Sequence, residues 1–202
     1  MIHIFDASKD YILENDVVLL RPMVANDYEY LLPFAINEPD IWKFSLISAS
    51  GEEGMTNYIN TALVQRTNDI EYAFIVFDKR TQQYAGSTRF YDILLTNRTM
   101  QLGYTWYGSK FEGTGLNKNC KLLMLQFAFE TLGMERIEFR ADNNNERSKA
   151  AMRSIGCVEE GVLRSHIPTY TGKRRNSIVL SILKNEWYGG VRERLVAKIK
   201  KA

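Results

Sequence analysis

The sequence predicts a single α+β domain built around a mixed, mostly antiparallel β-sheet. Three aromatic and β-branched runs follow one another with only short turns between them, which is typical of an antiparallel meander. A long amphipathic helix and a further strand come next, and this strand–helix–strand order is typical of a parallel crossover. The chain contains no repeat, low-complexity tract or linker, so we expect one domain over residues 1–202.

The first third of the chain is predicted to form one strand and two helices. The run VVLLRP, residues 17–22, reads as a short strand that ends at a proline. Residues 26–37 begin with an Asn-Asp pair suited to a helix cap and are expected to be helical. Residues 51–67 carry apolar side chains at helical spacing and predict a second helix.

The predicted meander covers residues 71–79, 83–93 and 99–108. Gly86 and Gly103 fall inside two of these strands. A glycine within a strand indicates a β-bulge or a close approach of another chain segment.

The crossover begins with an apolar stripe over residues 116–132, which predicts one long helix, and Gly133 lies where a C-terminal glycine cap belongs. Residues 136–141 then form the next strand. A shorter helix is expected after the polar turn that begins at residue 142, with Gly156 ending it.

The last part of the chain predicts a long hairpin and a terminal helix. The hairpin strands are residues 157–170 and 174–183, separated by TGK. Residues 189–202 form a basic helix that either docks on a partner or is a solvated end.

The composition is that of an ordinary soluble protein, with 45% hydrophobic and 25% charged residues and a net charge of +2. Bulk charge therefore gives no reason to expect nucleic acid or a membrane as a partner. The chain start lacks the pattern of a signal peptide. Cys120 and Cys157 are isolated, and only two histidines exist. We expect reduced thiols, a cytoplasmic location and no metal site.

The junction KFEGTGLNKNC joins a glycine-rich loop to the start of the long helix. The first turn of a helix has unpaired N–H groups and a partial positive charge, and a preceding glycine loop can turn more N–H groups toward the same point. The amides that would hold a phosphate belong to Gly113, Thr114, Gly115, Leu116, Asn117 and Lys118. Lys118 and Lys121 would add charge at the rim. The alternative is a plain strand-to-helix turn.

The spacing of this junction matches neither the nucleotide P-loop nor GxGxxG, whose third glycine position holds Lys118. A second candidate feature is Asn145 followed by Ser148. Asn145 either only caps the short helix, or caps it while Ser148 points into a cleft.

Taken in order, these stretches resemble the GNAT superfamily of acetyl-CoA-dependent N-acetyltransferases, in particular the branch related to ribosomal-protein N-terminal acetyltransferases. The resemblance covers residues 16–188, the expected core. It rests on LLRP in the first strand and on the stretch from GYTWYGSKFEGTG to EGVLRSH. The family's phosphate loop, Q/R-x-x-G-x-G/A, falls on residues 112–117. Glu112 replaces the Gln or Arg, and Asn117 replaces the last small residue.

The resemblance implies a sheet that splays open near its middle, with the pantetheine arm of acetyl-CoA in the gap. It also implies which residues bind the cofactor: Tyr104, Thr105, Trp106, Glu112, Gly113, Thr114, Gly115, Leu116, Asn117, Lys118, Asn145 and Ser148. Glu112 is expected to turn its carboxylate toward solvent, because it would repel a diphosphate.

The implied reaction moves an acetyl group from a thioester to a primary amine. Ser148 would protonate the leaving thiolate, directly or through Asn145 and a water. A backbone N–H of residues 103–107 would stabilise the oxyanion.

The general base is open, because Gln101 stands where relatives often carry Glu. Glu71, Glu138 and a water held by Tyr104 or Tyr107 are the candidates, and a water chain without a dedicated base is an alternative.

The acceptor is either a protein N-terminus or a small amine. Trp42, Phe44, Tyr91 and Tyr170 either read this acceptor or only pack. The hairpin tip, with Lys173, Arg174 and Arg175, is either a solvated turn or a contact for the cofactor's 3′-phosphate or an acidic partner. A homodimer is compatible with the sequence. The alternative function is a non-catalytic CoA-binding module with the same fold.

Overall fold

The computed structural model describes residues 5–201. One of the two histidines on whose small number the expectation of no metal site rests, His3, lies outside the described residues. The strands are β1 (Leu13–Glu14), β2 (Val18–Pro22), β3 (Glu71–Asp78), β4 (Gln83–Leu94), β5 (Thr99–Tyr107), β6 (Arg136–Asp142), β7 (Val158–Pro168) and β8 (Arg174–Leu183). The α-helices are α1 (Tyr28–Asn37), α2 (Gly51–Thr67), α3 (Leu116–Gln126), α4 (Glu146–Ser154), α5 (Lys184–Glu186) and α6 (Arg192–Lys200).

The strands form one sheet in the order β1-β2-β3-β4-β5-β6-β8-β7. All neighbouring pairs are antiparallel except β5 and β6, which run parallel. The predicted meander is therefore confirmed as β3-β4-β5, and the predicted crossover is confirmed as β5-α3-β6. The sheet is mixed and mostly antiparallel, as the sequence indicates.

The parallel pair gives the fold its opening. β5 and β6 are paired only at Thr99–Arg136, Met100–Ile137 and Gln101–Glu138. Beyond these pairs β5 continues to Tyr107 and β6 to Asp142 without pairing to each other, so the two strands diverge. The splayed sheet is thus confirmed, and the diverging halves leave room for a ligand.

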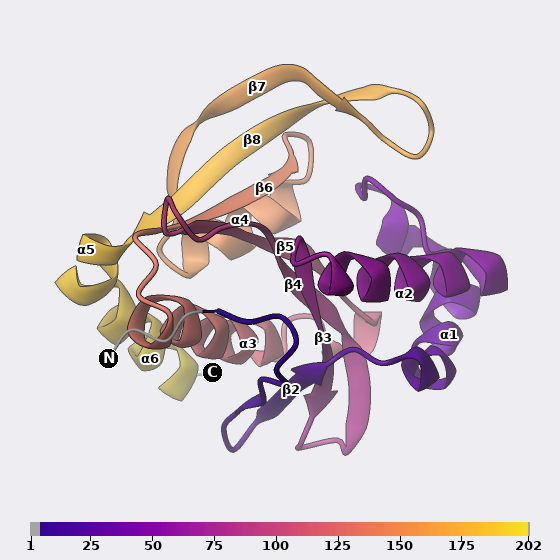
Figure 1. The fold of residues 1–202 in the computed structure, drawn as a ribbon, viewed down its shortest axis with the longest axis horizontal. Helices are drawn as coiled ribbons and strands as arrows, with labels where there is room; N and C mark the ends of the chain where they lie inside the picture. The colour runs from indigo at the N-terminus through magenta and orange to yellow at the C-terminus, as the bar shows by residue number, and fades with distance from the viewer. Residues whose placement is uncertain (1–4, 202) are drawn as a thin grey trace.

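Helices cover the sheet on both sides (Figure 1). Helices α1 and α2 lie on one side and α3 with α6 on the other, while β7 and β8 form a long curved hairpin. Alternation along β4 supplies both layers: Arg89 lies over the Tyr58 ring of α2, whereas Phe90 faces Phe127 at the end of α3. The β5–β6 junction is therefore enclosed from two directions.

Some of the local structure differs from the sequence-based expectation. The predicted helix over residues 116–132 is α-helical only to Gln126 and continues as a π-helical turn, Phe127–Thr131. Strand β1 is too short to be recognised from its two residues. The C-terminal segment is no free tail, because Leu195 of α6 is 1% exposed and Phe5 at the other end joins the same core. The core therefore includes residues on both sides of 16–188.

Gly86 is required by the closeness of β4 and β5. A Cβ atom added at Gly86 would lie 2.1 Å from the carbonyl oxygen of Trp106, and Gly86 has φ 153°. Gly161 has the same φ, but nothing lies within 4 Å of its added Cβ. Substituting each of these two glycines by alanine would cause the same backbone strain, but only at Gly86 would the added Cβ overlap other atoms.

We predict that Gly86→Ala lowers the free energy of unfolding by about 3 kcal/mol more than Gly161→Ala, because only the first variant overpacks the sheet. Urea unfolding of both variants and the wild type measures this difference. Equal losses in the two variants would contradict the steric explanation.

Candidate functional site

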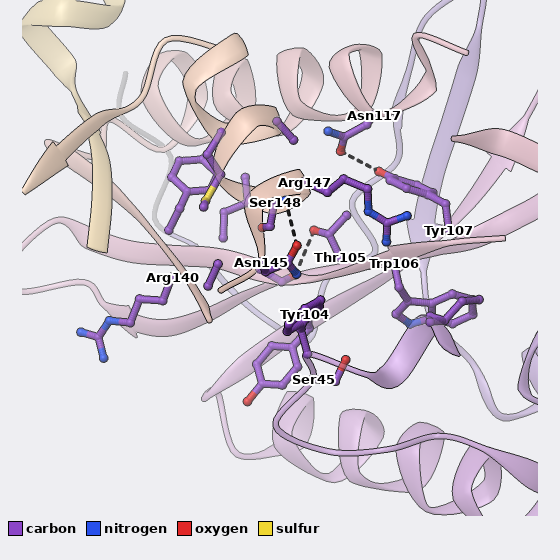
Figure 2. A pocket seen from close by; sticks show the side chains of 18 of the residues that line it. Ser45, Tyr104, Thr105, Trp106, Tyr107, Asn117, Arg140, Asn145, Arg147 and Ser148 are labelled. Atoms are coloured by element: carbon purple, nitrogen blue, oxygen red, sulfur yellow. Dashed lines mark hydrogen bonds between the residues drawn. The ribbon is translucent and has the colours of Figure 1, made fainter. Parts of the chain in front are cut away.

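A cavity of about 390 Å³ opens where β5 and β6 part. Its wall is formed by β5, the end of β6, the loop before α3, the first turns of α3, helix α4, the segment from residue 41 to 47, and Arg175 of β8. Figure 2 shows side chains from these elements converging on one space. The cavity lies at the junction that the sequence marks as the candidate site.

The loop before α3, which lines this cavity at Gly113 and Gly115, has backbone donors without an acceptor in the described chain. Gly113 and Gly115 adopt φ 72° and 81°, a left-handed conformation that glycine adopts without strain. Among residues 5–201, no acceptor is hydrogen-bonded to the backbone N–H groups of Gly113, Thr114, Gly115, Asn117 and Lys118. The N–H of Leu116 has only a 3.5 Å contact with the hydroxyl of Thr114. Amides left unpaired at a helix start are suited to bind an anion.

The side chains of this loop are placed in different ways. Glu112 is exposed and forms an ion pair with Arg147 of α4. Figure 2 shows the Arg147 side chain extending over the cavity. The carboxylate of Glu112 is thus directed to a cation rather than simply to solvent. The pair links the two elements between which a ligand would enter.

The side chains of the other loop residues are mostly bonded to the protein or buried, so mainly their backbone groups are free to bind a ligand. The hydroxyl of Thr114 donates to the carbonyl of Phe111, and the Leu116 side chain is fully buried in the core. Asn117 lines the cavity, but its Oδ1 accepts from the hydroxyl of Tyr107. Lys118 lines the cavity and is half-buried.

Strand β5 has a β-bulge in the cavity wall. Tyr104 and Thr105 together oppose the single residue Thr88 of β4, and Tyr104 has φ 47°. A bulge of this kind removes backbone groups from the ladder and redirects the strand. Gly103 precedes it closely, and its added Cβ would lie 2.9 Å from the ring of Tyr91. The strained segment is the part of β5 that β6 leaves unpaired.

Tyr104, Thr105 and Trp106 all line the cavity, as predicted. The Tyr104 ring packs edge-on against Tyr91 at 5.0 Å, and burial raises the pKa of Tyr104. The indole N–H of Trp106 donates to the hydroxyl of Tyr58, which fixes that ring in the wall. These side chains are held by packing before any ligand arrives.

Asn145 caps helix α4, and the side chain of Ser148 is left unpaired beside the cavity, which is the second of the two alternatives that the sequence leaves open. The Oδ1 of Asn145 accepts from the backbone N–H of Ser148 at 3.0 Å, so Asn145 caps α4. Both residues also line the cavity. The Ser148 hydroxyl forms no hydrogen bond to the protein among residues 5–201, and it is therefore available to a ligand.

The carboxylates proposed as bases are engaged elsewhere. Glu71 pairs with the buried Arg89 at 2.6 Å, and Glu138 pairs with Arg140 at 2.6 Å. Neither carboxylate is among the residues that line the cavity. Gln101 lies outside it too, and its amide donates to Asp92.

Asp142 is a cavity-lining carboxylate that the sequence did not single out. It ends β6, and its Oδ1 accepts from the backbone N–H of Asn144 at 2.9 Å. The end of the strand therefore fixes one oxygen of Asp142 and places the side chain in the wall.

Lys121 was expected at the rim, but the structure buries it in the cavity wall, 5% exposed. Its amine donates to the hydroxyls of Thr105 at 2.6 Å and Thr88 at 3.2 Å. It forms no ion pair within the described chain, and burial lowers its pKa to about 7. Its spacing from Leu116 and Cys120 on α3 places it beside the apolar face, which was the available signal.

Of the four aromatic residues proposed to contact the acceptor, three lie in the cavity wall and one lies on the protein surface. Trp42, Phe44 and Tyr91 line the cavity, whereas Tyr170 on the hairpin is 50% exposed and does not. Arg175 turns into the cavity, so it is no solvated tip residue.

The sequence was compared with models of known protein families. The model of the acetyltransferase (GNAT) domain family matches residues 18–158. The chain belongs to the GNAT acetyltransferase family. Members of this family are acetyl-CoA-dependent acyltransferases, which agrees with the resemblance found in the sequence.

Individual relatives of this GNAT protein differ in how much of it they match. It is 32% identical over 104 residues to the Bacillus subtilis (strain 168) protein named "Putative ribosomal N-acetyltransferase YdaF", a match that covers 52% of this chain and only 56% of that relative. The uncharacterized N-acetyltransferase p20 of Bacillus licheniformis is 23% identical over 182 residues, covering 88% and 98% of the two chains. A GCN5-related N-acetyltransferase from Brucella melitensis has the same fold, with a TM-score of 0.86 at 22% identity over 95% and 86% of the chains.

Two other features of the GNAT protein concern residues 5–201. Within this range no group of His, Cys, Asp and Glu side chains is arranged to hold a metal ion, and no helix is long and apolar enough to cross a membrane. Cys120 and Cys157 are free and buried, which confirms that they form no disulfide with each other.

Lys121 predicts a pH dependence of stability. Its pKa is about 7 in the folded chain against 10.5 for an ordinary lysine, so the unfolded chain binds more protons between these values. Stability must then rise with pH across this window, by at most about 1.4 kcal/mol per pH unit. We predict that the wild type gains roughly 2 kcal/mol relative to Lys121→Met between pH 7 and pH 9.

Urea unfolding at pH 7, 8 and 9 measures this gain. Leu122→Met is the control, because it places the same side chain one residue along the helix and removes no titrating group. If the free energy of unfolding changes with pH in the same way for the wild type and Lys121→Met, the pKa of Lys121 is not lowered in the folded chain.

Proposed function

We propose that this GNAT protein transfers an acetyl group from acetyl-CoA to a primary amine. The observation that carries the proposal is the set of unpaired backbone amides at the start of α3, where Gly113, Gly115, Asn117 and Lys118 line the cavity between β5 and β6. Such amides fit an anion like the diphosphate of CoA.

The proposed cofactor position follows from this anchor. The amides of residues 113–118 hold the diphosphate, and Lys118 adds positive charge beside them. The pantetheine arm enters the gap between β5 and β6, along the bulge at Tyr104 and Thr105. Arg147 borders the entry, where Glu112 balances its charge in the absence of a ligand.

The chemistry requires an amine without its proton, because an alkylammonium has a pKa of about 10.4 and no lone pair. Asp142 is the carboxylate in the cavity wall beyond the mouth, and we assign the proton to a water path that ends there. The amine nitrogen then attacks the thioester carbonyl, whose oxygen is stabilised by backbone N–H groups of residues 103–107.

Collapse of the tetrahedral species breaks the carbon–sulfur bond and releases a thiolate, while the nitrogen loses its extra proton to solvent and Ser148, after donating its own, is reprotonated from solvent. Ser148 is the proposed proton donor, because its hydroxyl is in the cavity wall and unbound to other protein groups. Asn145 positions Ser148 by capping the helix turn that carries it. The acceptor is an amino compound or a protein N-terminus, and the name of the relative YdaF favours the second.

Release of free thiol from acetyl-CoA in the presence of a panel of peptides and small amines tests the proposal. Transfer to at least one amine, with the N-acetyl product identified by mass spectrometry, would support it. Uptake of acetyl-CoA with no thiol release from any amine would instead favour a non-catalytic CoA-binding module.

We predict that Ser148→Ala lowers kcat by about 10- to 100-fold, because a positioned proton donor contributes about 100- to 10,000-fold and water replaces it in part. The affinity for acetyl-CoA should change less than about threefold, because one neutral hydrogen bond contributes only about 1 kcal/mol. Steady-state kinetics and calorimetry measure the two quantities.

Ser154→Ala is the matched control, because Ser154 lines the same cavity from α4 but its hydroxyl already donates to the carbonyl of Ala151. If Ser148→Ala and Ser154→Ala have the same kcat as the wild type, Ser148 is no proton donor.

A further inference from the structure

Arg175 on β8 differs from the other arginines in how its charge is balanced. Every other arginine that is not exposed forms an ion pair with a carboxylate, whereas the half-buried Arg175 forms none among residues 5–201. A partly buried charge without a counter-ion is unfavourable. The position of Arg175 therefore needs a reason outside the folding of this chain.

The contacts of Arg175 are all with neutral groups. Its Nε donates to the hydroxyl of Ser177 at 2.9 Å, and its Nη1 donates to the carbonyl of Phe44 at 3.5 Å. Its Nη2 has no hydrogen-bond partner within the described chain. Burial lowers the pKa of Arg175, which is the expected effect of a guanidinium held away from water.

Arg175 belongs to the end of the cavity opposite the anion-binding loop. It contacts Phe44, and the charged groups that act on it include Asp142 and Arg140. Figure 2 shows Ser45 and Tyr104 on one side of the cavity and Asn117 and Arg147 on the other. A diphosphate held at the start of α3 would leave Arg175 at the side from which an acceptor approaches the acetyl group.

We infer that the acceptor amine carries a carboxylate, and that Arg175 binds it. The inference rests on the proposed transferase function and names the class of acceptor. A guanidinium presents parallel N–H donors that match a carboxylate, and such charge-assisted pairs are stronger than neutral hydrogen bonds. Tyr91, beside Arg175, supplies an apolar ring for the carbon skeleton of the acceptor.

Anchoring the segment that carries Phe44 does not account for the charge of Arg175. One long hydrogen bond to a carbonyl leaves the guanidinium uncompensated, and a neutral donor would form it at lower cost. The carboxylate could belong to a free amino acid or to an acidic side chain near a peptide N-terminus. Both sources present the same chemistry, so the experiment has one arm for each.

The first arm compares free amino acids with their carboxamides as acceptors. The second compares amidated peptides with Asp or Glu at the second position against the same peptides with Asn or Gln. In at least one arm, we expect the carboxylate to raise kcat/KM by about 10- to 100-fold, mainly through KM. Arg175→Met should abolish this preference, and Arg175→Lys should retain part of it.

Arg174→Met is the matched control. Arg174 lies on the same hairpin but is exposed, and it donates to the backbone of Ser165 and His166. This variant should keep the carboxylate preference of the wild type.

A binding arm needs no turnover. Calorimetry in the presence of CoA compares the N-acetyl form of each carboxylate compound with the N-acetyl form of its amide. The wild type should prefer the carboxylate product by a similar factor, and Arg175→Met should not.

Equal use and equal binding of carboxylates and amides would overturn the inference, as would a preference that survives in Arg175→Met. These outcomes are separable from a failure of the proposed function. Thiol release with neutral amines alone would overturn only the role of Arg175. Absence of acetyl-CoA binding would overturn the transferase proposal, while product binding would still report on Arg175.

Discussion

Five backbone N–H groups at the start of α3, those of Gly113, Thr114, Gly115, Asn117 and Lys118, have no acceptor within the described chain. Unpaired N–H groups at a helix start are suited to bind an anion, and four of these five residues line the cavity. The glycines make the arrangement possible, because Gly113 and Gly115 adopt left-handed conformations that other residues adopt with strain. The direction of α3 is in turn set by the crossover between β5 and β6.

The sheet supplies the space that these donors face. Three residue pairs hold β5 to β6, and the remainder of each strand is left free. The bulge at Tyr104 lies in the free part, so the strained backbone and the opening coincide. The core on both faces of β4 keeps the paired part rigid. A stable sheet thus carries a locally open segment, which is a common arrangement for binding sites.

Two basic side chains that form no ion pair within the described chain, Arg175 and Lys121, lie in the wall of the site. Most half-buried arginines pair with a carboxylate, but Arg175 does not, and Lys121 is buried against two hydroxyls. Folding alone gives no benefit for either charge. Their presence in the cavity wall agrees with a site that trades stability for ligand recognition.

The sequence predicts most of the fold because its signals are local. The apolar spacing over residues 51–67 gives α2 with its observed bounds, and Asn145 caps α4 as its residue type suggests. Glycine spacing also predicts that the loop before α3 is a candidate anion site. Other features depend on tertiary contacts. Lys121 has the polar character of a rim residue, and only the packing of α3 on β4 and β5 buries it. Likewise, Arg175 reads as part of a basic turn, and only the folded hairpin brings it into the cavity wall.

The most direct measurement is a crystal structure of the complex with acetyl-CoA. We predict that oxygens of the diphosphate lie about 3 Å from the backbone nitrogens of residues 113–118, the usual length of such hydrogen bonds. A diphosphate held by side chains elsewhere, with these amides turned to solvent or to protein carbonyls, would contradict the account.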